Sequence, residues 1–207
     1  MNSTNVENSG LSFAPVSAEI RTPGGDRVMA VDSDFLVGLT RPGGAVVPYE
    51  LGYDWGREMY ELLERESLKS FPNINTMRDL AMPDFQKLFS EHLSMLGWGT
   101  FELKKRDEFL FVDVHHSPLS DAVSAAPKKD MPSTSCDFYA GFLASIFSAV
   151  SGMNLASIEI TCSCENYDWC SFLLDNETVV QQVRNLIGTN YQPLEAFQKI
   201  KAEMGNE

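Results

Sequence analysis

The spacing of apolar residues along the chain predicts three helices in its first three quarters. The first covers 47–66 and carries Pro48 in its first turn, a position that favours proline. The second covers 82–99 and the third 136–152, and each repeats apolar residues at i, i+3 and i+4. His92 lies on the apolar stripe of the second helix. We therefore expect a core or edge histidine whose polar atoms are satisfied.

Alternation of apolar and polar residues predicts two β-hairpins, at 100–118 and 156–174. After them the chain returns to helix over 177–204, with a break near Gly188 or Pro193. In the first hairpin both faces of the second strand are largely apolar, so we expect that strand to be covered on both sides. One face carries Leu110, Val112 and Val114, and the other carries Phe109, Phe111 and Asp113.

Helices mixed with antiparallel hairpins predict a mixed α/β (α+β) fold, an antiparallel sheet with packed helices. Residues 1–20 begin with a polar run and are expected to form a flexible tail. Residues 21–175 are expected to form the domain and residues 176–207 a helical extension. The stretch 121–135 is rich in Ala, Ser and Pro, which predicts a mobile loop.

Two glycines, Gly52 and Gly56, lie one turn apart on the same face of the first predicted helix. A glycine inside a helix costs about 1 kcal/mol relative to alanine, so we expect a contact that compensates. Close approach of another helix or of a ligand would provide it, and tight helix packing is the commoner case.

Composition and charge exclude several classes of protein. The 207 residues include 29 acidic and 16 basic side chains, for a formal net charge of -13. Direct binding to nucleic acid is not expected, because phosphate backbones attract clustered Lys and Arg. No window approaches the roughly 18 continuous apolar residues of a membrane span, and the polar N-terminal run is unlike a signal peptide. A soluble, cytoplasmic protein is the simplest expectation.

The cysteines are the strongest chemical signal in the sequence. Three of the four lie within nine residues, and Cys136 precedes the third predicted helix. A reducing compartment keeps such thiols unpaired, which favours metal ligation over a disulfide scaffold. Cys162 and Cys170 are eight residues apart and face each other across a hairpin, while the helix dipole at Cys136 favours the thiolate form. Three sulfur ligands of a zinc site are thus predicted.

The fourth ligand has two candidates, Glu159 and Cys164. In a regular strand Cys162 and Cys164 share one face and Glu159 lies on the other, so alternation favours four thiolates. A β-bulge would remove the conflict and admit Glu159, and bulges gather at functional sites. Two other interpretations stay open: inert thiols buried in the core, or a disulfide between Cys162 and Cys170.

Three segments together resemble the 4-vinyl reductase domain family: PYELGYDWGREMYELL, SCDFYAGFLASIF and IEITCSCENYDWCSF. The resemblance covers roughly residues 46–174. This domain is the sensory module of phenol- and xylene-responsive bacterial activators. It also occurs in stand-alone proteins linked to chlorophyll or bacteriochlorophyll biosynthesis, and its fold is akin to vesicle-tethering subunits. The family's zinc pattern falls here on Cys136, Glu159, Cys162 and Cys170 with its spacings preserved, so the resemblance implies Glu159 as the fourth ligand.

The resemblance also implies a dimer that encloses an apolar cavity near the zinc layer. In the sensors, aromatic compounds bind in that cavity and are held partly by a Trp and a His. The candidates for such a pocket in this chain are His115, His116, Trp55, Trp98 and Tyr139.

These features predict a stand-alone, zinc-stabilised domain that binds a hydrophobic aromatic or tetrapyrrole ligand in a sensing, carrier or photosynthetic-assembly role. We expect no ATPase or DNA-binding domain after this domain, because the sequence ends about thirty residues beyond it. An enzyme or accessory factor of chlorophyll vinyl reduction is the alternative, although no dinucleotide-binding fingerprint and no Ser-His-Asp set is present. A protein-binding adaptor is a third hypothesis.

Overall fold

The computed structural model of the chain describes residues 10–14, 17–33, 35, 38, 47–125 and 136–205. The expected mobile loop therefore lies largely outside the described residues.

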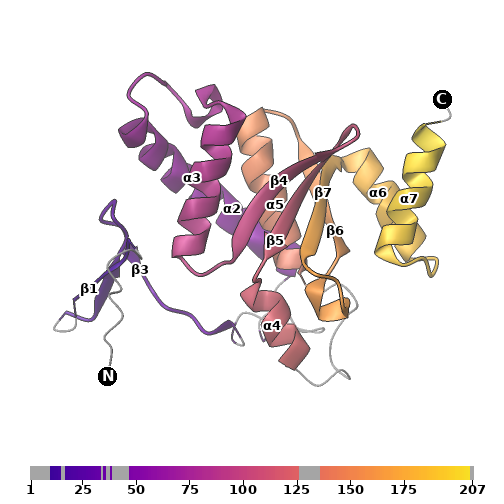
Figure 1. The fold of residues 1–207 in the computed structure, drawn as a ribbon, viewed down its shortest axis with the longest axis horizontal. Coiled ribbons are helices and arrows are strands. Elements are labelled where there is room, and N and C mark those ends of the chain that lie inside the picture. Colours follow the sequence, from indigo (N-terminus) through magenta and orange to yellow (C-terminus); the bar gives the residue numbers. More distant parts are fainter. Residues whose placement is uncertain are drawn as a thin grey trace.

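The described residues contain helices of about two to six turns and two antiparallel sheets (Figure 1). The helices are α2 (Pro48–Ser70), α3 (Met82–Met95), α4 (Pro118–Ala125), α5 (Asp137–Ser151), α6 (Glu177–Ile187) and α7 (Pro193–Met204), with 3-10 turns η1 (Met77–Asp79) and η3 (Ser163–Glu165). The strands are β1 (Ser12–Ala14), β2 (Glu19–Arg21), β3 (Arg27–Val28), β4 (Thr100–Arg106), β5 (Phe109–His115), β6 (Leu155–Thr161) and β7 (Cys170–Asn176). The predicted mixed α/β class is confirmed.

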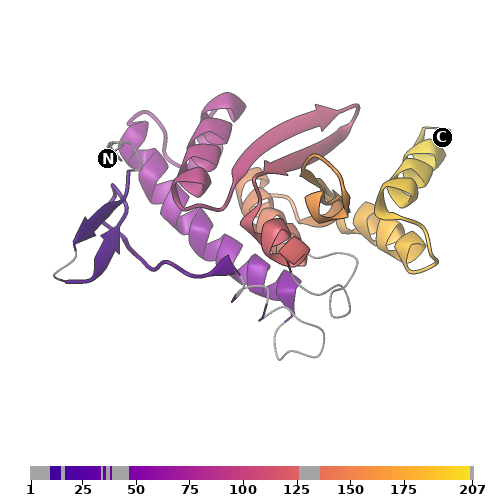
Figure 2. The ribbon, with the colours of Figure 1, turned by 60° about the horizontal axis from the view of Figure 1, so that its bottom comes forward.

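The larger sheet has the strand order β4-β5-β7-β6, and every neighbouring pair is antiparallel. The three short strands β1, β2 and β3 form a separate sheet at the end of the molecule away from α6 and α7 (Figures 1 and 2). Strand β1 and the start of β2 fall inside the segment 1–20 that was expected to be a tail.

Both faces of the larger sheet are covered, as the alternation in β5 predicted. Val112 and Val114 are fully buried in the core that α2, α3 and α5 build on one face. Phe109 and Phe111 are buried on the other face, against α6 and α7. Because Phe197 of α7 meets both phenylalanine rings edge-on, the C-terminal helices form part of the core rather than a loose appendage.

The helix ends follow local backbone rules. Helix α3 stops at Met95, earlier than predicted, because Gly97 and Gly99 have φ of +81° and +100°. Gly152 ends α5 in the left-handed conformation, as expected from its sequence position. The chain breaks between α6 and α7, and Pro193 occupies the first turn of α7.

The loop predicted at 121–135 is wrong for its first five residues, which belong to helix α4. Leu119, Ala122 and Val123 are buried in the core at helical spacing. This segment is short and rich in Ala, Ser and Pro, but its helix presents one apolar stripe to the core. Packing of that stripe decides the conformation.

No helix in the described part of the chain is long and apolar enough to cross a membrane.

Helices α2 and α5 are in direct backbone contact at their glycines. A Cβ atom on Gly52 would lie 1.9 Å from the carbonyl oxygen of Phe138, and one on Gly141 would lie 1.9 Å from that of Tyr49. A Cβ on Gly56 would meet the carbonyl oxygen of Phe142 at 2.7 Å. The glycine pair read from the sequence, Gly52 and Gly56, therefore serves helix packing, and Gly141 on α5 adds a third such contact.

His92 is buried on α3 as predicted, but its Nε2 atom has no hydrogen-bond partner among the described residues. Burial lowers the pKa of His92, and the acidic side chains of Glu66 and Asp26 oppose that shift. In the unfolded chain the pKa returns to about 6.5, so the unfolded state binds the proton more readily. Stability contributed by neutral His92 is therefore lost as the pH falls through about 6.5 toward the lower folded pKa.

We expect the free energy of unfolding of His92→Phe to fall less than that of the wild type as the pH is lowered. Urea unfolding at about pH 7.5 and about pH 6 measures this difference. His116→Ala, at an exposed position, is the matched control and should leave the pH dependence as it is in the wild type. A His92→Phe variant with the wild-type pH dependence would contradict this prediction.

Candidate metal centre

Four buried side chains converge where the N-terminus of α5 meets the β6–β7 hairpin. Cys136 is the N-cap residue of α5, and Cys162 follows directly after β6. Cys170 opens β7, and Glu159 lies within β6. Their ligand atoms, three Sγ atoms and a carboxylate oxygen, all lie within 4.8 Å of one another. We call these four residues the candidate metal centre.

The spacing of the sulfur atoms suits a tetrahedral ion. The Sγ atom of Cys162 lies 3.9 Å from that of Cys136 and 3.7 Å from that of Cys170. Two thiolates bound to one zinc at about 2.3 Å in tetrahedral geometry are separated by about 3.8 Å. The two sulfur–sulfur distances match that value without any rearrangement.

A change of register in β6 brings Glu159 and Cys162 to the same site. Glu159 pairs with Phe172 of β7, and Thr161, two residues on, pairs with the adjacent Ser171. The extra residue between them is a β-bulge, which reverses the alternation of faces. The regular strand on which alternation favoured Cys164 is therefore absent here, and the bulge that admits Glu159 is present.

The chemistry of this cluster fits a cation. Neither carboxylate oxygen of Glu159 accepts a hydrogen bond of ordinary geometry from a described residue. Burial and the nearby sulfur of Cys170 raise the pKa of Glu159 well above its usual range. Hydrogen bonds from Cys136 and Cys162 hold the pKa of Cys170 well below its usual range. Three thiols and an acid in one dry site cannot all ionise unless a positive charge joins them.

The donor set also limits what a bound ion can do. Three sulfurs and one oxygen complete a tetrahedral shell, so no coordination position is left for water or substrate. Such closed sites stabilise a fold, whereas hydrolytic zinc sites keep one position open.

Three of the five pocket candidates lie together beside this centre. The rings of Trp55 and Trp98 are 4.4 Å apart, and the Tyr139 hydroxyl donates to the backbone carbonyl of Trp98 at 2.6 Å. Phe138 contacts both tryptophans at ring distances of 5.5 and 5.6 Å. Tyr139 is completely buried, whereas Trp55 and Trp98 are only half-buried. We call these four residues the aromatic cluster.

Similarity to known proteins appears in structure and not in sequence. No protein-family model matches the sequence, and no curated protein matches it either. The crystal structure of the phenol-responsive sensory domain of the transcription activator PoxR, with phenol, matches with a TM-score of 0.60. The two chains share 13% sequence identity over 84% of this chain and 90% of the other. This chain therefore shares its fold with that domain.

Two further solved structures are similar at longer range. A vinyl-4-reductase family protein from Methanocaldococcus jannaschii has a TM-score of 0.42, 16% identity and coverage of 68% of this chain and 73% of its own. Trafficking protein particle complex subunit 3 from Naegleria fowleri, covalently bound to palmitic acid, has a TM-score of 0.38, 9% identity and coverage of 70% and 82%. These two superpositions are too loose to support conclusions, and the sensory domain alone confirms the expected fold.

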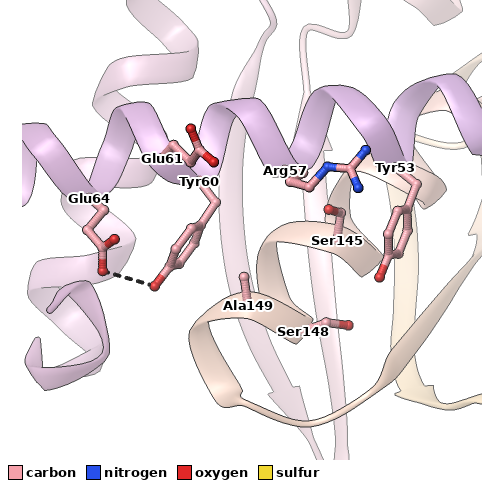
Figure 3. Close-up of a pocket in the computed structure, with 8 residues that line it drawn as sticks. All are labelled: Tyr53, Arg57, Tyr60, Glu61, Glu64, Ser145, Ser148 and Ala149. Atoms are coloured by element: carbon pink, nitrogen blue, oxygen red, sulfur yellow. Dashed lines mark hydrogen bonds between the residues drawn. The ribbon is translucent and has the colours of Figure 1, made fainter.

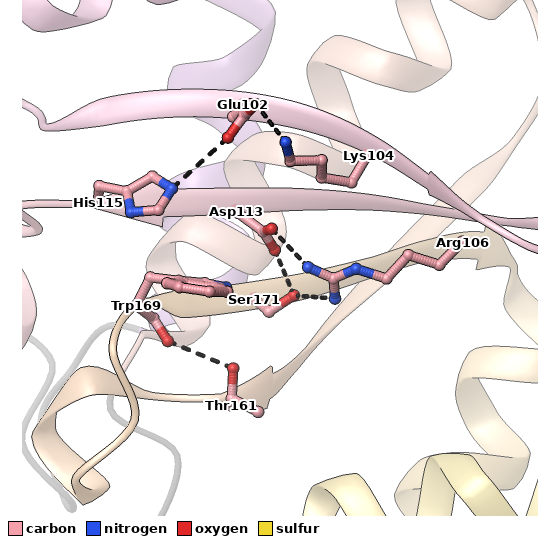
Figure 4. A network of polar contacts seen from close by, with 8 residues as sticks. All are labelled: Glu102, Lys104, Arg106, Asp113, His115, Thr161, Trp169 and Ser171. Carbon is pink, nitrogen blue, oxygen red and sulfur yellow. Dashed lines mark hydrogen bonds and ion pairs between the residues drawn. The ribbon is translucent and has the colours of Figure 1, made fainter.

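The other two pocket candidates lie at and just after the end of strand β5. His115 is on the opposite face of the sheet, with its ring 5.2 Å from that of Trp169 and its Nε2 atom 3.8 Å from Glu102 (Figure 4). His116 follows the strand end, is exposed and has φ of +55°. His115 thus lies on the face opposite the aromatic cluster, whereas the backbone of His116 lies beside Gly99, the residue that follows Trp98.

Beside His115 lies a polar network that sequence reasoning missed. Asp113 is almost fully buried, accepts a hydrogen bond from Ser171 at 2.6 Å and pairs with Arg106 at 2.5 Å (Figure 4). Arg106 also donates to Ser171 at 3.0 Å, so the buried carboxylate has two partners. One acidic residue in the apolar run FLFVDV is the only sequence signal for it. Its full pairing is typical of a structural group.

A surface groove of about 530 Å³ between α2 and α5 was also missed. Figure 3 shows its lining side chains on the facing turns of the two helices. They are Tyr53, Arg57, Tyr60, Glu61, Glu64, Ser145, Ser148 and Ala149. The α2 members recur at helical spacing, which could have identified the face but not the hollow. None of the predicted pocket residues lines this groove.

Proposed function

We propose that the chain is a zinc-stabilised domain that binds a hydrophobic aromatic or tetrapyrrole ligand and acts as a sensor or carrier. The match to a phenol-responsive sensory domain along most of both chains carries this proposal. Phenol is the ligand of that domain, and the aromatic cluster offers related chemistry here.

The proposed zinc would be held by the four residues of the candidate metal centre. When bound, it supplies a fixed positive charge that lets the buried thiols and the carboxyl ionise together. Cys136 would thereby fasten the start of α5, and Cys162 with Cys170 would close the hairpin. Because the shell is full, the role proposed for zinc is structural, and the role proposed for the domain is binding rather than catalysis.

The aromatic cluster is the proposed contact surface for the ligand. Trp55 and Trp98 present large, half-buried rings to each other, and offset stacking on such rings favours flat aromatic molecules. Ligand pockets are mostly apolar with a few placed polar groups, and the Tyr139 hydroxyl, bonded to the carbonyl of Trp98, is a polar group beside these rings. A phenol meets these requirements, and so does a larger conjugated ring system.

The first test identifies what the protein carries. An absorption spectrum and mass spectrometry of freshly purified protein are expected to reveal a bound aromatic or tetrapyrrole compound. Native mass measured on the same sample tests the homodimer that the resemblance implies.

Calorimetric titration with phenol provides the second test. We expect Trp98→Ala to weaken binding about tenfold, since an aromatic contact contributes about 1.4 kcal/mol. Trp169→Phe changes the tryptophan on the other face of the sheet, and binding should stay at the wild-type level. Equal affinity in all three proteins would exclude the aromatic cluster as the binding surface. The absence of any aromatic ligand, together with a stable protein partner, would favour the adaptor hypothesis.

A further inference from the structure

The fourth cysteine, Cys164, lies just outside the candidate metal centre. It sits in the 3-10 turn η3 between the two strands of the hairpin, and its Sγ atom is 3.0 Å from that of Cys162. Cys164 is half-buried, whereas the other three cysteines of the chain are buried. A reagent in solvent therefore meets Cys164 first.

This position gives Cys164 a different chemistry from the ligands beside it. Two thiolates that share a tetrahedral zinc lie about 3.8 Å apart, so a 3.0 Å separation does not suit joint ligation. It does suit bond formation, because the two sulfurs need to approach by only about 1 Å. Redox-active cysteines are typically accessible and stand next to a second thiol that can resolve the oxidised form.

We propose that Cys164 is an oxidation site, and that peroxide converts Cys164 and Cys162 into a disulfide that removes one ligand from the metal. The thiol pair is independent of the proposed function, whereas the release of metal rests on the zinc centre proposed above. The turn η3 thus makes the stability of the domain depend on the redox state of its surroundings.

The reaction balances with hydrogen peroxide as the oxidant. The Cys164 sulfur attacks one peroxide oxygen, the O–O bond breaks, and the departing hydroxide takes up a proton to give water and a sulfenic acid. The Cys162 sulfur then attacks the Cys164 sulfur, the S–S bond forms, and the S–O bond breaks to release a second water. The two sulfurs each lose one electron, and the peroxide gains both.

Loss of Cys162 leaves Cys136, Glu159 and Cys170 as donors. The ion then has three of its four ligands. The end of β6 is no longer tied to the ion, because Cys162 is the residue that directly follows this strand. The start of η3 remains anchored, because the Ser163 hydroxyl lies 2.6 Å from that of Ser120 on α4. The change is therefore expected to release metal before it unfolds the domain.

The sequence allows a direct test of the pairing. Cleavage after Glu159 and Glu165 releases the peptide ITCSCE, which contains Cys162 and Cys164 and neither of the other cysteines. Metal content is measured first. Protein is then treated with dilute hydrogen peroxide while a zinc-sensitive dye follows the released metal. Remaining thiols are alkylated, the protein is cleaved, and the mass of the peptide is measured by mass spectrometry.

In the wild type we expect ITCSCE to be lighter by two hydrogen atoms than its reduced form and unalkylated, with loss of zinc in step with that peptide. Cys164→Ser should contain zinc before treatment and keep it over the same interval. A disulfide between Cys162 and Cys170, or equal zinc loss from the wild type and Cys164→Ser, would overturn the proposal. Protein purified without zinc that still forms the ITCSCE disulfide would contradict the metal centre and leave the oxidation site standing.

Discussion

Replacing Cys162 with serine is expected to remove the metal from the domain and to lower its melting temperature by about 10 °C. The Sγ atom of Cys162 lies within 4 Å of the Sγ atoms of both Cys136 and Cys170, so replacing Cys162 removes a ligand that contacts both other sulfurs. An incomplete structural site costs about 3 kcal/mol or more, and each kcal/mol shifts the melting temperature of a domain of this size by about 3 °C. Elemental analysis and thermal unfolding followed by circular dichroism measure both effects.

The matched variant is Cys164→Ser, which should retain metal and melt close to the wild type. Glu159→Gln adds a further comparison, because it keeps the shape of the side chain and removes the charge that an ion needs. We expect Glu159→Gln to lose metal. Loss of metal from Cys164→Ser together with retention by Glu159→Gln would instead indicate a site of four thiolates.

Substitution of alanine for Gly52 is expected to destabilise the fold by about 3 kcal/mol or more. The new methyl group would lie 1.9 Å from the carbonyl oxygen of Phe138, and backbone of a buried helix cannot move aside as a flexible side chain can. The two helices must separate, and the core between α2, α5 and the sheet loosens with them. Urea unfolding monitored by circular dichroism gives the change in free energy.

Gly188→Ala is the control for this prediction. Gly188 has φ of -60°, and a Cβ there would meet its nearest neighbour at an ordinary 3.4 Å. Alanine at such a site is expected to be neutral or to stabilise by about 0.5 kcal/mol. If Gly52→Ala unfolded at the same urea concentration as Gly188→Ala, the close helix contact would not exist in solution.

The sequence predicts those parts of the fold whose signal is local. Helix α5 has strong apolar periodicity and a glycine stop, and the structure reproduces both within one residue. Helix α4 was missed, because eight residues are too few for a clear helical period and a stretch rich in Ala, Ser and Pro suggested a loop; packing against the core decides its conformation. Gly52 indicated a close contact from its sequence position, but only the structure identifies Phe138 as the partner.

In the candidate site, too, the sequence predicts what depends on local spacing and misses what depends on the three-dimensional structure. The spacing of Cys162 and Cys170 indicated a hairpin that brings both sulfurs together, and it does. The choice between Glu159 and Cys164 depended on whether β6 is regular, and counting residues cannot detect a bulge. His115 was grouped with the tryptophans through a resemblance that aligns loosely there, and strand alternation places it on the other face of the sheet.

The glycine contact has a mechanical consequence. At Gly52 and Gly141 the backbones of α2 and α5 touch without side chains between them, so one helix cannot slide past the other without a clash. Trp55 belongs to α2, and the first residue before α5 is Cys136. The glycine contact therefore fixes the position of Trp55 on α2 relative to Cys136 at the start of α5, with no side chain between the two helix backbones to take up a displacement.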